Sequence, residues 1–112
     1  MMKKWKCGVC GYIHDGDDVC DVCPKCGAAA EKFEAVDEAA GDLIERSRNT
    51  NALHAQLIDL ARQIERVCEA GLRDALDPGC VDVFQKSLNA SYIQMKLSMT
   101  EMQGHMNKGK WG

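Results

Sequence analysis

The sequence predicts a small metal knuckle of short β-hairpins, followed by an all-α antiparallel helical hairpin. Two Cys-x-x-Cys pairs, separated by twelve residues, lie within the first 26 residues. After residue 36 the chain becomes poor in glycine, and two long segments follow with apolar residues at three- and four-residue spacing. We therefore expect two domains in these 112 residues, one at 1–36 and one at 37–112.

The two Cys-x-x-Cys pairs form the predicted metal site. Two residues between paired cysteines let both sulfur atoms reach one ion from a tight turn, while backbone N–H groups of that turn point back at the sulfurs. Gly11 and Gly27 follow the pairs and permit the positive φ that such turns need. About thirty residues bury too little apolar surface to fold unaided, so the metal would also hold the domain together. The expected ligands are Cys7, Cys10, Cys23 and Cys26.

Residues 5–36 resemble the rubredoxin-like domain found in rubrerythrins. The resemblance rests on Trp5-Lys6-Cys7-Gly8-Val9-Cys10-Gly11-Tyr12, on Cys23-Pro24-Lys25-Cys26-Gly27 and on Phe33-Glu34. It implies one iron per chain that cycles between the ferrous and ferric states and passes single electrons. It also implies a small aromatic core beneath the metal, made of Trp5, Tyr12 and Phe33. A tetrahedral set of four thiolates accepts zinc as well as iron, so the residues themselves leave the metal open.

Cys20 departs from the family pattern, which commonly has proline three positions before the second pair. Cys20 and Cys23 make a third Cys-x-x-Cys, so a shifted ligand set is one interpretation. The second is an unligated surface thiol. The third is a thiol close to the metal that reacts with an oxidant or a partner, which exposure and a lowered pKa would favour.

Four aspartates form an acidic loop between the two pairs. This loop is either a solvated turn, helped by Gly16, or a docking face for a basic redox partner. The net charge is -3 and neither half of the chain is strongly basic, which argues against nucleic acid as a partner. The residues concerned are Asp15, Asp17, Asp18 and Asp21.

Two helices are expected, at about 38–70 and 77–106. Asp37 offers an N-cap for the first helix, and Gly71 is placed where a left-handed residue would end it. Asp77 and Pro78 suit the cap and the first position of the second helix. Lysines after residue 106 suit the negative end of its dipole.

Each helix carries an apolar seam, and we expect the two seams to face each other. The first comprises Leu43, Leu53, Leu57, Leu60, Ile64 and Val67, and the second comprises Leu88, Tyr92, Met95, Met99, Met102 and Met106. Further apolar residues outside the seams would need cover from a second hairpin, which predicts a homodimeric four-helix bundle. These residues are Ile44, Ile58, Ala61, Phe84, Ile93 and Leu97.

The helices lack the motif of a di-iron peroxidase centre, which rubrerythrin carries in its bundle. Such a centre needs Glu-x-x-His, and no glutamate in the helical segments has histidine three residues later. Methionines with one histidine could instead ligate haem or copper, or simply fill an irregular core. The candidates are Met95, Met99, Met102 and His54. Cys68 and Cys80 flank the turn between the helices, as small buried residues or as a redox-sensitive link.

The expected function is one-electron transfer by an iron–tetrathiolate site on a helical dimerisation scaffold, rather than enzymatic catalysis. One alternative is a zinc-ribbon interaction module without redox activity. Another is a redox enzyme or sensor with an additional haem or metal in the dimer bundle. The basic N-terminus is not followed by an apolar run and no later run is long enough to span a membrane, so we expect a cytoplasmic protein.

Overall fold

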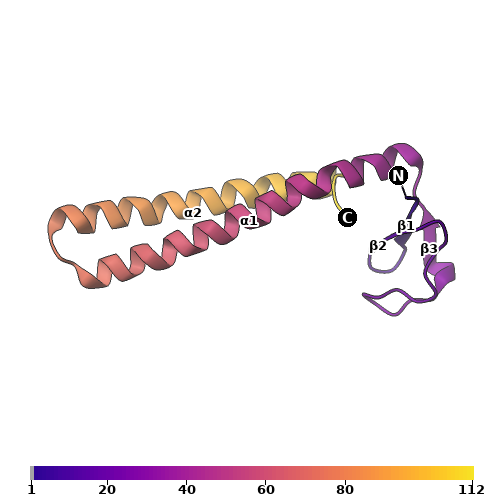
Figure 1. Cartoon of the computed structure of the whole chain (residues 1–112), viewed down its shortest axis with the longest axis horizontal. Helices are drawn as coiled ribbons and strands as arrows, with labels where there is room; N and C mark the ends of the chain where they lie inside the picture. Colours follow the sequence, from indigo (N-terminus) through magenta and orange to yellow (C-terminus); the bar gives the residue numbers. More distant parts are fainter. Residues whose placement is uncertain (1) are drawn as a thin grey trace. The chain divides into compact units, whose positions relative to one another are not determined.

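A computed structural model describes residues 2–112. It contains strands β1 (Lys4–Cys7) and β2 (Ile13–Asp15), the 3-10 turn η1 (Ala30–Lys32), strand β3 (Phe33–Ala35), and helices α1 (Glu38–Asp74) and α2 (Pro78–Asn107) (Figure 1). This order confirms the predicted knuckle followed by a helical hairpin. The chain divides into two compact units. The first runs up to Arg48 and includes Gly109–Gly112, and the second is Asn49–Lys108.

The knuckle is built on a three-stranded antiparallel sheet with the order β2-β1-β3. In the central strand, Trp5 pairs with His14 of β2 on one side and with Ala35 of β3 on the other. An isolated bridge between Val22 and Ala29 closes the loop that carries the second cysteine pair. The sheet and this loop together present the two cysteine pairs to each other.

The core of the knuckle is small and lies directly under the cysteines. Phe33 is buried with Cys7 and Cys23, and Trp5 packs against this cluster. The Trp5 indole Nε1 donates a hydrogen bond to the carbonyl oxygen of Gly16 at 3.0 Å. Tyr12, which the resemblance placed in the same aromatic core, is instead exposed and contributes its backbone to the first metal turn.

A network of four charged side chains stabilises the first unit. Lys4 is buried, and its Nζ lies 2.8 Å from Glu45 Oε2 and 3.4 Å from Asp15 Oδ1. Arg48 binds Asp15 through both terminal guanidinium nitrogens, and its Nη1 also lies 2.9 Å from Glu45 Oε2. Each charge thus has opposite charges beside it, which is the condition for burying a lysine in a domain this small.

Asp15→Asn is expected to destabilise the first unit by about 1–3 kcal/mol at pH 7, because it removes a charge partner from buried Lys4. The Arg48 guanidinium lowers the pKa of Asp15 below its ordinary value of 3.8. Because the pKa of Asp15 is lower in the folded chain than in the unfolded chain, its ionised carboxylate stabilises the fold fully above pH 3.8. This stabilisation is lost as the pH falls through the pKa of Asp15 in the folded chain. The gap in thermal midpoint between wild type and variant should therefore shrink below pH 3.8. Exposed Asp17→Asn is the control, and a pH-independent gap would contradict this assignment.

Both helices begin where the caps predicted. The Asp37 carboxylate accepts a hydrogen bond from the Ala40 N–H at 2.8 Å, and the Asp77 carboxylate accepts one from the Cys80 N–H at 2.7 Å. Pro78 occupies the first turn of α2. No helix among residues 2–112 carries an apolar stretch long enough to cross a bilayer.

The predicted end of the first helix at Gly71 is wrong. Helix α1 continues to Asp74, and the residue with positive φ is Ala75, at 49°. Gly71 is helical, and glycine is required there for a different reason. A Cβ atom at this position would lie 2.4 Å from the ring of Phe84 in α2. The glycine therefore makes room for an aromatic ring of the opposite helix.

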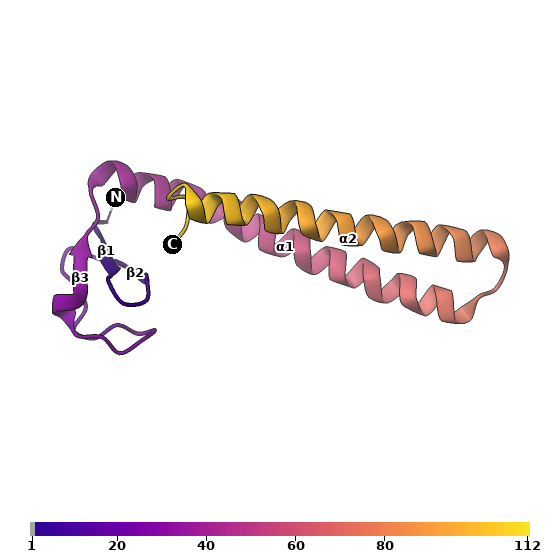
Figure 2. The same ribbon diagram turned by 180° about the vertical axis from the view of Figure 1, so that it is seen from behind.

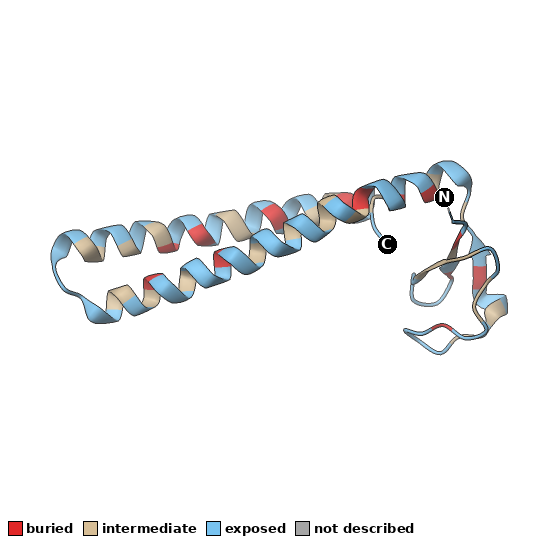
Figure 3. Ribbon diagram, in the orientation of Figure 1, coloured by how far each residue is buried: buried red, intermediate tan, exposed pale blue. Residues whose placement is uncertain are grey.

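The seam between α1 and α2 is shifted by one position in each helix from much of the predicted one. Within the second unit, Asn49–Lys108, α1 lies beside α2 (Figure 1, Figure 2). Its buried positions, coloured red in Figure 3, are three or four residues apart along much of each helix. The predicted α1 leucines at 53, 57 and 60 are 43–53% exposed. The inward-facing residues are His54, Ile58, Ala61, Glu65, Cys68 and Leu72 of α1 and Phe84, Leu88, Ser91, Met95, Ser98, Met102 and His105 of α2.

Small residues explain why the seam is shifted. Ala61, Ser91 and Ser98 are buried, and such residues let two helix backbones approach closely. The Ser91 hydroxyl donates to the carbonyl of Leu88 at 2.7 Å, so burial leaves it satisfied. The most hydrophobic stripe of α1 consists of the exposed residues next to the buried ones, so hydrophobicity alone predicts the wrong seam there.

Candidate metal centre

The two Cys-x-x-Cys turns have the same backbone geometry. The Gly11 N–H donates to the carbonyl of Cys7 at 2.9 Å, and the Gly27 N–H donates to the carbonyl of Cys23 at 2.9 Å. The two glycines have φ of 83° and 78°, the left-handed region that side chains disfavour. Both glycines therefore serve the role that their positions predict.

The first cysteine of each pair is also held in the same way. The Cys7 N–H donates to the carbonyl of Tyr12 at 2.9 Å, and the Cys23 N–H donates to that of Ala28 at 2.8 Å. These two cysteines are buried, at 1% and 2% exposure, whereas Cys10 and Cys26 are exposed. The site thus has a buried side against the small core and an open side at the surface.

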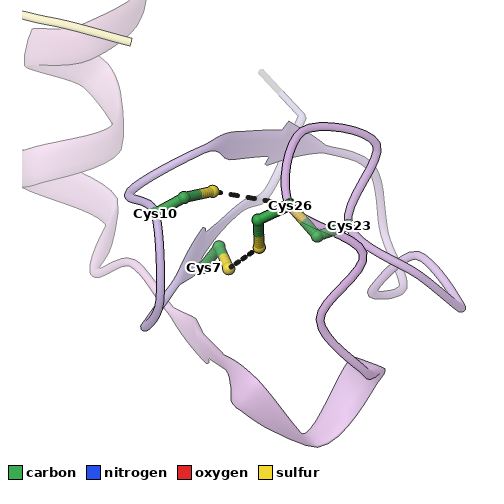
Figure 4. Close-up of side chains that lie close together, drawn as sticks. All are labelled: Cys7, Cys10, Cys23 and Cys26. Carbon is green, nitrogen blue, oxygen red and sulfur yellow. Dashed lines mark hydrogen bonds between the residues drawn. The ribbon is translucent and has the colours of Figure 1, made fainter.

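The four sulfur atoms lie close together between the two turns (Figure 4). All four lie within 4.8 Å of one another. The Cys7 and Cys26 sulfurs are 3.7 Å apart, and those of Cys10 and Cys23 are 3.6 Å apart. Ligands placed about 2.3 Å from a tetrahedral ion lie about 3.8 Å from each other. The four cysteines therefore fit a single tetrahedral metal ion with no position left open.

Backbone N–H groups stabilise negative charge on the buried sulfurs. N–H groups of Cys10 and Val9 lower the pKa of the Cys7 thiol to about 6. Burial opposes ionisation of Cys23, but the N–H groups of Cys26 and Lys25 outweigh it, so its pKa is also lowered.

The Cys26 sulfur lies close to the other three sulfurs of the cluster. The Ala28 N–H favours its thiolate, but partial desolvation of the sulfur and the neighbouring thiols raise its pKa to about 12. Four thiolates in one place repel each other, so a metal must displace protons when it binds. The pattern is that of a site completed by a cation.

Cys20 lies outside the four-sulfur group. Among the described residues, the clustered sulfurs are those of the two outer pairs, which does not support the shifted ligand set. Cys20 is half-buried and packs against the cluster of Cys7, Cys23 and Phe33. It is therefore neither a ligand in this geometry nor a fully exposed surface thiol.

The acidic loop is only partly available to a partner. Asp15 is engaged by Arg48 and Lys4, so its charge is already neutralised within the first unit. Asp17, Asp18 and Asp21 are exposed. The His14 Nε2 lies 3.1 Å from the carbonyl of Asp18. These three carboxylates therefore remain at the surface of the first unit.

The other candidate ligands lie in the helices, where His54, like two of the methionines, is half-buried. Met95 and Met102 are half-buried in the seam, whereas Met99 is exposed. Among residues 2–112, the four cysteines form the one group of three or more His, Cys, Asp or Glu side chains close enough to share an ion. Cys68 is buried, Cys80 is half-buried, and both are free thiols.

His105 contacts side chains of α1 across the seam, which the sequence did not predict. It is buried, its ring lies 5.9 Å from that of His54, and its Nδ1 is 2.5 Å from Asn51 Oδ1. Its Nε2 is 3.4 Å from Glu101 Oε1, one helical turn earlier. The four-residue spacing of Glu101 and His105 was the available signal, but their partner on α1 is 54 residues away in the sequence.

Comparisons with known proteins agree with this geometry. Residues 5–34 match the family model "Rubrerythrin, rubredoxin-like domain". The chain is also similar to reverse rubrerythrin-1 of Clostridium acetobutylicum, with 37% identity over 83 residues, which is 73% of this chain. The chain spans 40% of the length of that relative. An alignment of 83 residues is longer than the matched domain, so it includes helical residues. No solved structure matches the chain.

Proposed function

Because residues 5–34 are a rubredoxin-like domain of the rubrerythrin type, we propose that this chain is a one-electron transfer protein with a mononuclear iron–tetrathiolate site. The observation that supports this most strongly is the closed group of four sulfur atoms, within 4.8 Å of one another, between two matching turns. The ligands would be Cys7, Cys10, Cys23 and Cys26. The similarity to reverse rubrerythrin-1 supports the same proposal, because the name of that relative and the matched domain model point to one family.

The donor set favours electron transfer over bond chemistry. Bound iron would supply a ferrous/ferric couple, and four thiolates leave no ligand position for a substrate. The rigid turns hold Cys7 and Cys23 in place through backbone hydrogen bonds, so little rearrangement is needed when the charge of the site changes. The N–H groups that point at these sulfurs would set the potential by stabilising the more negative state.

The exposed side of the site is the natural place for a redox partner. Cys10 and Cys26 lie at the surface, and the neighbouring Val9 is 64% exposed. A partner that covers Val9 would exclude water between the two redox sites. The exposed Asp17 and Asp18 would attract a basic partner, and the association rate would then fall as salt concentration rises.

Zinc is the second candidate metal, because the same donors and the same spacing suit it. A zinc-loaded chain would be an interaction module without redox activity. An additional haem or metal in the helices is a weaker proposal, since the described His, Cys, Asp and Glu side chains of the helices form no group of three that could share an ion, and Met99 is exposed.

The deciding experiment is metal analysis with absorption spectroscopy of protein from iron-supplied cells. We expect about one iron per chain and a visible thiolate-to-iron band that dithionite bleaches and air restores. The same protein refolded with zinc is the colourless control. Zinc in the isolated protein despite ample iron, with no visible band, would contradict the electron-transfer proposal. A separate sharp band near the blue edge of the visible range would reveal haem.

A further inference from the structure

The helical hairpin of the second unit has an uncovered apolar face along its groove. A groove of about 370 Å³ runs along it, lined from α1 by Leu57, Leu60, Ala61 and Ile64 and from α2 by Ser87, Ala90, Ser91 and Gln94. The residues that flank the groove each precede an inward-facing residue by one position, so they share one side of the hairpin. They are Leu53, Leu57, Leu60, Ile64 and Val67 of α1 and Val83, Ser87, Ala90, Gln94 and Leu97 of α2.

This face carries no charge, unlike the opposite side of the hairpin. None of the ten residues that flank the groove is charged. The positions that follow the inward-facing residues of α1 include Asp59, Arg62, Arg66 and Glu69. An uncharged face does not select a partner of opposite charge, and it is compatible with a copy of itself.

The exposed area matches what one partner contributes to a stable dimer. Seven of the flanking side chains are large and apolar and expose 43–65% of their surface. Together they present roughly 400–500 Å² of apolar area. A stable interface buries about 800 Å² per partner, of which a little over half is apolar. The face is thus large enough to support association.

The two helices contribute complementary shapes to the face. Helix α1 presents a ridge of leucine, isoleucine and valine, whereas the middle of α2 presents the small Ser87 and Ala90. In a two-fold dimer, residue i of one copy meets residue j of the other, and j meets i. The α1 ridge of each copy can then occupy the groove of the other.

We propose that a second copy of this chain covers this face, so that two hairpins form a four-helix bundle. The proposal rests on residues 53–97 alone and does not depend on the identity of the metal. The sequence alone predicts that Leu53, Leu57 and Leu60 pack inside a single hairpin. In this proposal they pack between two hairpins instead.

The test is the mass of the full metal-loaded chain in solution. Sedimentation equilibrium at about 50 μM should give twice the chain mass of 12.4 kDa. Leu60→Glu should raise the dissociation constant more than about 100-fold, because each dimer contains the buried charge twice. Ala55→Glu adds the same charge at an exposed α1 position on the other side and should leave the dimer unchanged. Circular dichroism confirms that each variant keeps its helices.

Two results would overturn the proposal. One is a wild-type chain that sediments as a monomer at this concentration, and the other is a dimer that Leu60→Glu does not weaken. Should Leu60→Glu lose helicity, Ala90→Glu provides an independent variant on α2, because Ala90 is exposed and lines the same groove. A folded Ala90→Glu chain that dimerises as tightly as wild type also counts against the proposal.

Discussion

Cys23→Ser is expected to abolish the visible absorption of the iron-loaded protein and to reduce its metal content far below one per chain. The Cys23 sulfur is buried and lies 3.6 Å from that of Cys10, so its removal takes away one of the four clustered sulfurs on the buried side of the site. A serine hydroxyl does not ionise near neutral pH, so three thiolates would remain. We expect metal affinity to fall by at least about 100-fold. Absorption spectroscopy and metal analysis measure both effects.

Cys20→Ser is the matched control for this variant. Cys20 is three residues away and packs against the same small core, but its sulfur is outside the group of four. The variant should keep its colour and its metal. An unchanged spectrum in Cys23→Ser, or loss of the metal in Cys20→Ser, would show that the ligand assignment is wrong.

Gly71→Ala is expected to destabilise the helical hairpin by about 1 kcal/mol, as the net of overpacking and of the gain in helix propensity. Alanine normally stabilises a helix interior by about 1 kcal/mol relative to glycine. Here its Cβ would lie 2.4–2.5 Å from three carbon atoms of the Phe84 ring, so the helices must separate or the ring must move. Overpacking of this kind costs about 1–3 kcal/mol. Thermal unfolding followed by circular dichroism should show a lower midpoint.

Gly104→Ala is the matched control, and it is expected to raise the thermal midpoint in the same experiment. Gly104 lies inside α2, and a Cβ there would meet no atom within 4 Å. Helix propensity alone then applies, and we expect the midpoint to rise. The double variant Gly71→Ala with Phe84→Leu should recover part of the lost stability. Stabilisation by both glycine replacements would contradict the close approach at Gly71.

The features that could be predicted are those encoded within a few residues. A Cys-x-x-Cys followed by glycine, or an aspartate that caps the next turn as Asp37 and Asp77 do, needs only local backbone geometry. The four sulfur ligands are of this kind, because each turn positions its own pair. The helix bounds at Glu38 and Pro78 follow for the same reason.

The features that could not be predicted depend on partners distant in the sequence. Whether Leu57 or Ile58 faces α2 is decided by how closely the helices approach, and Ala61 and Ser91 allow that approach without any hydrophobic signal. In the sequence, Gly71 is typical of a residue that ends a helix. Its actual role depends on Phe84, which lies beside it in the fold. Asp15 belongs to an acidic loop in the sequence, but Arg48, 33 residues later, makes it a structural residue.

Lys4 and Asp15 are direct partners in the β1–β2 ladder, so the sheet alone brings an ammonium and a carboxylate together. Starting a helix is the unfavourable step of its formation, since three residues must be ordered for the first hydrogen bond. Glu45 and Arg48 can attach to this preformed charge pair one turn apart and offset that cost. The charge pair of the strand hairpin is thus an anchor that favours the helical conformation of this part of α1.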